Sequence, residues 1–225
     1  MSEARRTSFP AFTHPVPSSE ECELRRTIGE FVQRAYRQRL FISTQGSLSA
    51  RLSPSSFLIT PVGLDRGSVE VQDIVLVNEG CVQSGCEPSR AAALHDAIYR
   101  AHPQVGCVIN AFPVNATAFS VTGALVDTRT IPESYVVLRR PAMVPYGIQF
   151  EAPEAVAATL SQVQPTLLIE NDGVLVTGKD VLEAFDRLEV LESTAEAFIN
   201  SRAVGSLSPM SDEVIRELEQ VFFGM

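Results

Sequence analysis

Positive charge is scarce in this sequence. Its 225 residues include 18 Lys and Arg against 27 Asp and Glu, which gives a formal net charge of -9 at pH 7. A surface that binds nucleic acid needs clustered Lys and Arg side chains to neutralise phosphates. The composition therefore argues against a nucleic-acid partner.

Long hydrophobic segments are missing as well. The longest apolar runs, such as residues 165–169 and 173–176, are far too short to cross a bilayer. Residues 1–21 contain basic side chains but no apolar core segment, so they lack the pattern of a secretory signal. We therefore expect a cytoplasmic protein with no membrane partner.

Cysteine is infrequent and unpatterned. The four cysteines show neither a C-x-x-C pair nor a flanking histidine, and they are Cys22, Cys81, Cys86 and Cys107. Paired cysteines at short spacing are the usual signal of a zinc site or a redox motif. We interpret these four as reduced, structural thiols.

What is present suits one ordinary folded domain. Hydrophobic residues make up 45% of the chain and charged residues 20%, which allows a substantial core. Residues 1–20 are rich in Pro, Ser and Thr and show no periodicity, which predicts an extended N-terminal arm. Nothing in residues 21–225 has the composition of a linker, so we predict a single domain there.

Hydrophobic periodicity within this domain alternates between helix and strand. In residues 88–120, apolar positions at helical spacing end at Pro103, and residues 105–109 form the apolar run typical of a central strand. Loops at strand ends carry function because the sheet holds them rigid, so we expect a site at residues 110–112. We also predict helices near 19–36, 153–160, 181–195 and 210–223 and strands near 46–51, 57–59, 74–77, 167–169 and 174–176. Loops are expected at 60–63, at the end of the second of these strands, and at 132–134.

Several short segments occur in a distinctive order and spacing. They include GSLSAR at 46–51, LITPVG at 58–63, PS at 88–89, the LH and IY pairs at 94–95 and 98–99, ATA at 116–118, VPY at 144–146 and NDGVLVTG at 171–178. In this order, over about residues 22–200, they resemble the class II aldolase/adducin family. The resemblance implies an α/β protein with a three-layer α/β/α fold, a central mostly antiparallel sheet, and a homotetramer with pockets at subunit interfaces.

The resemblance also points to a site whose metal ligands are replaced. The family binds a divalent metal, usually zinc, through a His-x-His at the end of the core strand and a His in an Asn-His-Gly turn, with a nearby acidic residue that carries protons. The corresponding positions here are Asn110, Phe112 and Asp172 for the ligands and Ala91 for the acid. An amide is a poor zinc ligand and a phenyl ring cannot ligate at all. We therefore expect no zinc and no other cofactor.

Two interpretations of these positions remain open. The site can be a decayed one that ordinary packing has filled. Alternatively, it holds a divalent metal through non-histidine ligands, such as magnesium bound by the oxygens of Asp172, Glu170 or Glu133. His95 lies on the helix before the core strand, where we expect it to be buried and hydrogen-bonded rather than a ligand.

A set of polar residues indicates an anion site next to these positions. Its expected ligand-binding members are Ser47, Thr60, Gly63, Ser89 and Arg90. Hydroxyls, backbone amides near glycine and one guanidinium suit a phosphate or carboxylate, because Arg offers a planar two-pronged donor. The alternative is that Arg90 forms an ion pair with Glu87 or Asp172 and only neutralises a carboxylate.

Two function classes follow. The first is a divergent family member without zinc-dependent aldolase activity, which binds a small anion of the sugar-phosphate or carboxylate type. The second is an active carbon–carbon lyase or isomerase that acts on a phosphorylated or carboxylated sugar with an altered metal or none. In the second case, Asp172 would be the acid/base group and Arg90 would hold the anion.

Overall fold

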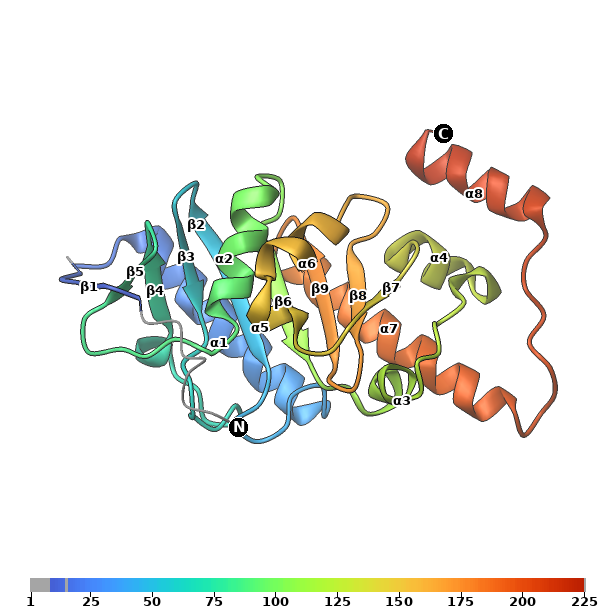
Figure 1. Cartoon of the computed structure of the whole chain (residues 1–225), viewed down its shortest axis with the longest axis horizontal. Coiled ribbons are helices and arrows are strands. Elements are labelled where there is room, and N and C mark those ends of the chain that lie inside the picture. Colours follow the sequence, from blue (N-terminus) through green and yellow to red (C-terminus); the bar gives the residue numbers. More distant parts are fainter. Residues whose placement is uncertain (1–8, 15, 225) are drawn as a thin grey trace.

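A single mixed sheet forms the centre of the computed structural model, which describes residues 9–14 and 16–224. Within these residues the sheet has nine strands in the order β1-β5-β4-β3-β2-β6-β9-β8-β7 (Figure 1). The strands are β1 (Ala11–Phe12), β2 (Ser47–Ser53), β3 (Ser56–Ile59), β4 (Val75–Asn78), β5 (Cys81–Gln83), β6 (Cys107–Ala111), β7 (Ala142–Val144), β8 (Thr166–Ile169) and β9 (Val174–Gly178). The β1–β5 and β7–β8 pairs are parallel and the other pairs are antiparallel. The predicted mostly antiparallel sheet is confirmed.

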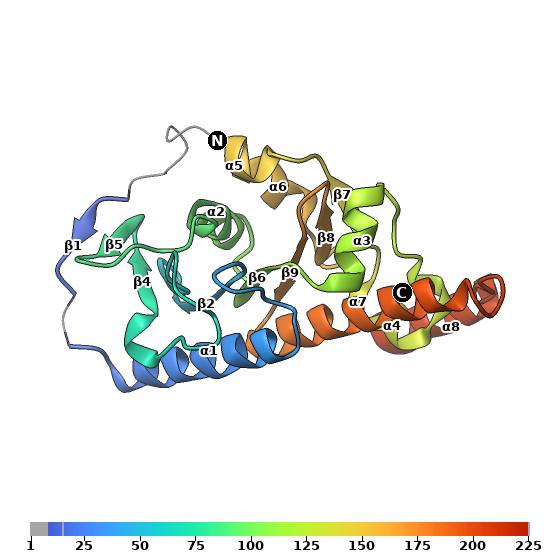
Figure 2. The ribbon, with the colours of Figure 1, turned by 90° about the horizontal axis from the view of Figure 1, so that it is seen from below.

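Helices cover both faces of the sheet, which confirms the three-layer arrangement. They are α1 (Ser19–Arg37), α2 (Ala92–Ala101), α3 (Val114–Thr122), α4 (Pro132–Leu138), α5 (Ile148–Glu151), α6 (Pro153–Thr159), α7 (Val181–Ser201) and α8 (Asp212–Phe223), with short 3-10 turns η2 (Val71–Asp73) and η3 (Thr128–Thr130). Figure 2 shows α1 and α7 along one face and α2, α5 and α6 on the other. Each face has its own apolar core because inward and outward side chains alternate along a strand.

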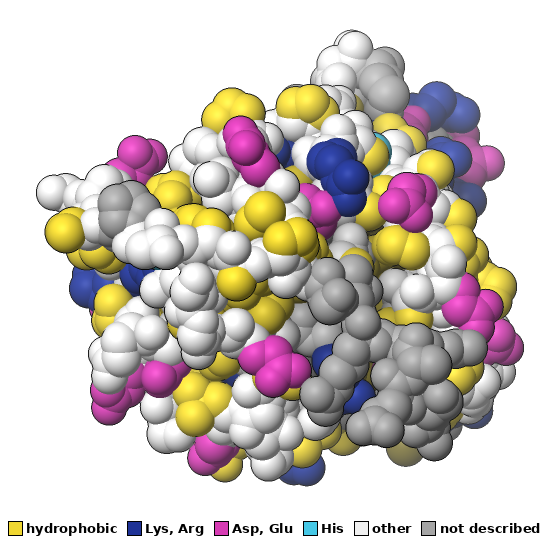
Figure 3. Space-filling model, turned by 60° about the vertical axis from the view of Figure 1, so that its left-hand side comes forward, with side chains coloured by type: hydrophobic (Ala, Val, Ile, Leu, Met, Phe, Trp, Pro, Cys, Tyr) yellow, Lys and Arg dark blue, Asp and Glu magenta, His cyan; other side chains and the backbone are white. Residues whose placement is uncertain are grey.

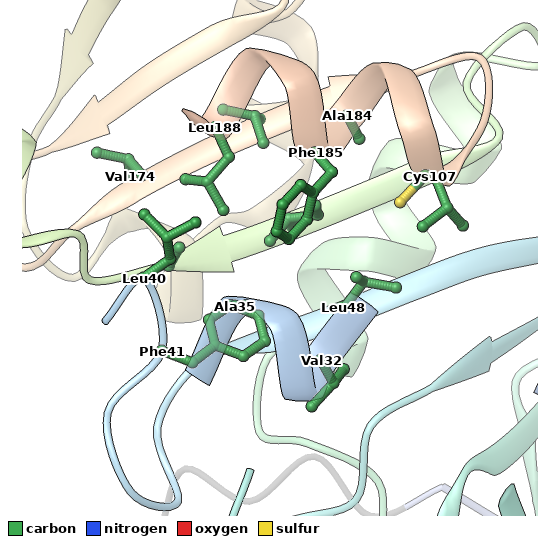
Figure 4. Packing of buried hydrophobic residues seen from close by; sticks show 14 of the residues in the cluster. Val32, Ala35, Leu40, Phe41, Leu48, Cys107, Val174, Ala184, Phe185 and Leu188 are labelled. Atoms are coloured by element: carbon green, nitrogen blue, oxygen red, sulfur yellow. The ribbon is translucent and has the colours of Figure 1, made fainter. Parts of the chain in front are cut away.

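The core between the sheet and the α1–α7 layer is closely packed. Side chains from α1, α7 and strands β2, β6 and β9 converge there (Figure 4). The Phe185 ring meets the Phe31 ring edge to face with centroids 5.0 Å apart, and the Arg34 guanidinium lies 4.7 Å from the Phe185 centroid. Aromatic pairs of this geometry stabilise a core beyond the area that they bury. The packing fixes the two helices against the strand that leads to the expected site.

One local prediction needs correction, and the structure adds detail to another. Residues 132–134 are not a loop, because Pro132 occupies the first turn of α4, where its fixed φ and missing N–H favour a helix start. The expected N-terminal arm also contributes to the sheet, since Ala11–Phe12 pairs with β5. The helix after it begins at Ser19, and the Ser18 hydroxyl accepts a hydrogen bond from the Glu21 backbone N–H at 3.1 Å. Residues 1–8 and 15 of the arm lie outside the described residues.

Helix α8 stands apart from the sheet at the far end of the molecule and contacts α4 (Figure 1). The Tyr135 hydroxyl donates to a Glu219 carboxylate oxygen at 2.6 Å across this contact. Acidic side chains are spread over the face shown in Figure 3, with Lys and Arg side chains among them. None of the helices in the described part of the chain is long and apolar enough to cross a membrane.

Candidate functional site

A cavity of about 440 Å³ lies where β6 ends and α2 begins. It brings together most of the residues that the sequence singled out, which come from five separate segments. The lining members of that set are Ser47, Gly63, Ser89, Arg90, Ala91, Asn110, Phe112 and Asp172. The expected anion site and the replaced metal positions therefore share one cavity.

Thr60 is the expected site residue that does not line this cavity. It is fully buried one residue after β3, where its hydroxyl accepts from the Leu48 backbone N–H at 3.3 Å. Its carbonyl accepts from the Ser89 backbone N–H at 2.9 Å. Because both bonds tie it to neighbouring backbone, Thr60 supports the wall that carries Ser89, and its predicted contact with a ligand is not supported by its position.

The end of β6 and the turn before β9 press against each other through Gly173. A Cβ atom at this position would lie 2.3 Å from the Ala111 carbonyl oxygen and 2.9 Å from the Phe112 ring. Only glycine allows this approach without displacement of the ring or the strand. Phe112 and Asp172 are thereby held on adjacent parts of the cavity wall.

Asn110 is oriented by a buried histidine. His95 Nε2 lies 3.0 Å from Asn110 Oδ1, and His95 Nδ1 lies 2.6 Å from Ser49 Oγ. An amide oxygen can only accept, so Nε2 carries the proton and the Ser49 hydroxyl donates to Nδ1. The Tyr99 hydroxyl, 2.8 Å from Ser49 Oγ, in turn donates to Ser49. This chain leaves the Asn110 NH2 group as a donor for the cavity.

His95 is fully buried, and burial lowers its pKa to about 4. It is therefore neutral at pH 7, which agrees with the single proton on Nε2. The prediction of a buried, hydrogen-bonded histidine is confirmed. Its role in this structure is to position Asn110.

Asp172 is the acidic group of the cavity. Burial raises its pKa, while the hydrogen bond from Gln149 and the charge of Arg90 act in the opposite direction. Gln149 Nε2 donates to Asp172 Oδ2 at 3.0 Å, and the Gln149 oxygen accepts from the Gly147 backbone N–H at 2.9 Å. Both ends of the Gln149 amide are thus engaged, which fixes the carboxylate of Asp172 in place.

Arg90 lies at the exposed rim. Its Nη2 donates to Gln45 Oε1 at 3.3 Å, and its charge lowers the pKa of Asp172. The ion pairs among the described residues do not include one between Arg90 and Asp172. The guanidinium remains accessible from the cavity. The geometry does not support a tight pair of Arg90 with Asp172, whereas the alternative pair with Glu87 and the anion-site interpretation both stay predictions.

Sequence reasoning missed several lining residues, above all Arg66. This arginine follows Asp65 in the loop after β3 and is only 2% exposed. Burial lowers the pKa of its guanidinium to about 10. Gln149, Tyr146 and Gln45 also line the cavity. No periodicity or motif distinguishes Arg66, Gln149 and Gln45 from surface positions, because their place in the cavity depends on how distant segments meet. Tyr146 belongs to the VPY segment of the family resemblance.

Comparison with known proteins identifies the family. The model of the Class II Aldolase and Adducin N-terminal domain matches residues 26–199. The chain belongs to the class II aldolase and adducin family. A 3-oxo-tetronate 4-phosphate decarboxylase of Haemophilus influenzae is 31% identical over 195 residues, which cover 84% of this chain and 90% of the relative.

Other members of the aldolase and adducin family agree. An L-fuculose phosphate aldolase of Methanococcus maripaludis is 28% identical over 164 residues, 72% of this chain and 88% of that one. The crystal structure of YgbL from Klebsiella pneumoniae superposes with a TM-score of 0.78 at 26% identity and covers 88% of this chain and 98% of YgbL. The chain is thus related to sugar-phosphate aldolases and decarboxylases.

The donor set in the cavity does not fit the zinc that the family implies. Phe112 offers no donor atom, the Asn110 oxygen already accepts from His95, and Asp172 supplies one carboxylate where three imidazoles would hold the metal at about 2.0–2.1 Å. Across residues 9–14 and 16–224, no three His, Cys, Asp or Glu side chains gather closely enough to share a metal ion. Glu133 and Glu170, the oxygen ligands of the magnesium alternative, are among these side chains.

Proposed function

We propose that this class II aldolase family member binds a small anionic ligand of the sugar-phosphate or carboxylate type and has no zinc-dependent aldolase activity. The observation that carries the proposal is the set of side chains that line the cavity at the end of β6. This set contains the guanidinium of Arg90, the hydroxyls of Ser47 and Ser89 and the amide of Asn110. It also contains the Phe112 ring, which lies at a position where the family has a metal ligand. The wall can therefore hold an anion but lacks the ligands for zinc.

The donors of the cavity suit oxygen anions. Arg90 offers a planar fork, and Ser47 and Ser89 add hydroxyls on two neighbouring segments. Helix α2 also begins at this wall with Ala91 as its N-cap, and no side chain caps its first N–H groups. The Ala92 N–H already donates to the Ser89 carbonyl at 2.9 Å, so this helix start favours negative charge mainly through the helix dipole. The names of the relatives, which include two kinds of phosphorylated sugar derivative, support the same ligand class.

A second candidate is an active carbon–carbon lyase or isomerase that uses Asp172 as its acid/base group. One observation favours it: burial raises the pKa of Asp172 while Gln149 fixes the carboxylate within the cavity. A positioned carboxyl group of raised pKa can accept a proton from a substrate and return it. This reaction would need no residue at the former metal positions other than Asp172.

Thermal-shift measurements with a panel of sugar phosphates and carboxylates test the proposal. We expect wild-type protein to gain stability with at least one phosphorylated compound, and Arg90→Ala to lose that gain. Arg100→Ala is the matched control, because Arg100 is an exposed arginine in α2, the helix that follows Arg90, and pairs with Asp96 away from the cavity. A wild-type protein that none of these anions stabilises would contradict the proposal.

The two candidates are separated by a retro-aldol and isomerase assay of the stabilising compounds in the presence of a chelator. Binding without turnover is the result expected from the first candidate. Turnover that Asp172→Asn abolishes, with binding retained, would establish the second.

A further inference from the structure

The cavity contains a buried positive charge without a counter-ion among the described residues. Arg66 Nε donates to the Gly46 carbonyl at 2.9 Å and Nη1 to the Leu64 carbonyl at 3.2 Å, whereas Nη2 donates to no described residue. The neighbouring Asp65 is exposed, and its Oδ1 accepts from the Gly67 backbone N–H instead. Asp65 therefore acts on Arg66 only through its charge.

Other arginines of the chain provide a comparison for Arg66. Arg25 is 5% exposed and pairs with Glu21 at 2.7 Å, and the partly buried Arg187 pairs with Glu183 at 3.1 Å. Arg139 is 8% exposed and forms no ion pair among the described residues, but its guanidinium lies over the Phe223 ring. A buried charge without a partner is strongly unfavourable, so proteins normally pair it. Arg66 differs from Arg25 and Arg187 because no carboxylate among the described residues pairs with it, and it lines the cavity that holds the expected anion-site residues.

We propose that Arg66 is an anchoring residue for a bound anion, and that Arg66 and Arg90 together select a tetrahedral dianion such as phosphate over a carboxylate. The inference rests on the proposed anion-binding function and specifies its ligand class. Arg66 lies at the buried side of the cavity and Arg90 at its exposed rim, so the two approach a ligand from different depths. A phosphate monoester has three terminal oxygens to share between two guanidinium forks, whereas the two oxygens of a carboxylate are satisfied by one fork.

A purely structural role for Arg66 is the competing explanation. Its bond to the Gly46 carbonyl braces a turn in which Gly46 has φ +100 and packs against the Phe41 ring. Loss of that brace would lower stability without changing which anions bind. The test must therefore measure anion selectivity as well as stability.

Calorimetric titration of inorganic phosphate, sulfate and acetate into wild-type and Arg66→Gln protein provides that measurement. We expect Arg66→Gln to weaken phosphate and sulfate binding about tenfold or more, because a hydrogen bond to a charged group is lost, and to change acetate binding little. Arg51→Gln is the matched control: Arg51 is partly buried, also donates to backbone carbonyls, of Val105, Tyr99 and His102, and does not line the cavity. It should lower the melting temperature and leave the phosphate Kd unchanged.

Equal phosphate affinity in folded Arg66→Gln and wild-type protein would overturn this inference and leave the proposed function intact. If Arg66→Gln does not fold, the inference is tested with wild-type protein alone. Because two guanidinium groups can bind the oxygens of sulfate, we expect sulfate to bind at least tenfold more tightly than acetate. Equal binding of the two ions would overturn the inference. Wild-type protein that binds neither phosphate nor sulfate nor acetate would overturn the proposed function itself.

Discussion

Asp172 is the residue whose charge state most directly affects an anion in the cavity. Its carboxylate replaces a family histidine, so a ligand group that imidazole and metal would attract is here repelled. Gln149 holds the carboxylate, and Arg90 offsets part of its charge. The cavity therefore contains both attraction and repulsion for an anion, and the balance between them can be shifted by one substitution.

Asp172→Asn should strengthen phosphate binding about fivefold. The change removes one negative charge beside the anion, worth roughly 1 kcal/mol in a partly solvated cavity, and retains an oxygen that can accept from Gln149. Calorimetry at pH 7 would measure the effect. Weaker binding in this variant would show instead that the carboxyl group contacts the ligand favourably.

Burial of His95 should make the stability of the folded protein depend on pH. Its pKa is lowered from its ordinary value of 6.5 to about 4 in the folded protein, so between these values the unfolded chain binds more protons than the folded one. Stability should therefore fall as the pH drops from about 6.5 to about 4, by up to about 3 kcal/mol. Above pH 6.5 this contribution is complete and constant.

Denaturant unfolding across this pH range would measure the contribution of His95. His95→Gln should show a shallower loss of stability than wild type, because glutamine does not titrate. His102→Gln serves as the control, since His102 is only partly buried and bonds to the Ala157 carbonyl. The same pH dependence in wild type and His95→Gln would contradict the assignment.

At the scale of elements, the end of β6 and the turn before β9 act as one unit. Asn110 on β6 pairs with Leu175 on β9 and with Ser47 on β2. The register of these two strand pairs therefore fixes the relative positions of three segments that border the cavity. Gly173 allows the turn to lie against Phe112. Residues that lie far apart in the sequence are thus positioned by strand pairing, not by local loop conformation.

Gly173→Ala should destabilise the protein by about 2 kcal/mol or more, because the new methyl group would overlap the Ala111 carbonyl and the Phe112 ring. Gly205→Ala is the control, since a Cβ there meets no atom within 4 Å. Chemical denaturation compares the two. A similar small effect in both variants would show that the strand and ring move aside easily.

The sequence anticipated the elements better than the cavity. Strand β6 and helix α7 follow from clear apolar periodicity, and the convergence of Asn110, Phe112 and Asp172 follows from the family resemblance. Thr60 was misplaced because the sequence could not show that its hydroxyl bonds to the Leu48 N–H across the sheet. Arg66 was missed for the same reason, since its burial depends on the turn at Gly46, which is distant in the chain.

At the scale of the whole molecule, α8 leaves apolar surface uncovered. Val221 is 75% exposed and Phe222 is 57% exposed at its end. Exposed apolar side chains of this size often mark surfaces that contact another chain. The homotetramer that the family resemblance implies stays a prediction, and this surface is a place where copies of the chain could meet.

Light scattering during gel filtration would measure the assembly. We expect the mass of four copies of the 24.5-kDa chain. Val221→Asp combined with Phe222→Asp should reduce the mass of the assembly if α8 contributes to the contact, whereas Val204→Asp, in the exposed segment before α8, is the control. A monomeric wild-type protein would contradict the prediction.

The central claim is that anion binding in this family member does not depend on zinc. The most direct test is the thermal stability of one preparation with a stabilising phosphorylated compound, measured once with a chelator and once with added zinc. Because Asn110, Phe112 and Asp172 do not form a zinc site, the account predicts the same ligand-induced rise in melting temperature in both conditions. A rise that disappears with the chelator and returns with zinc would contradict it.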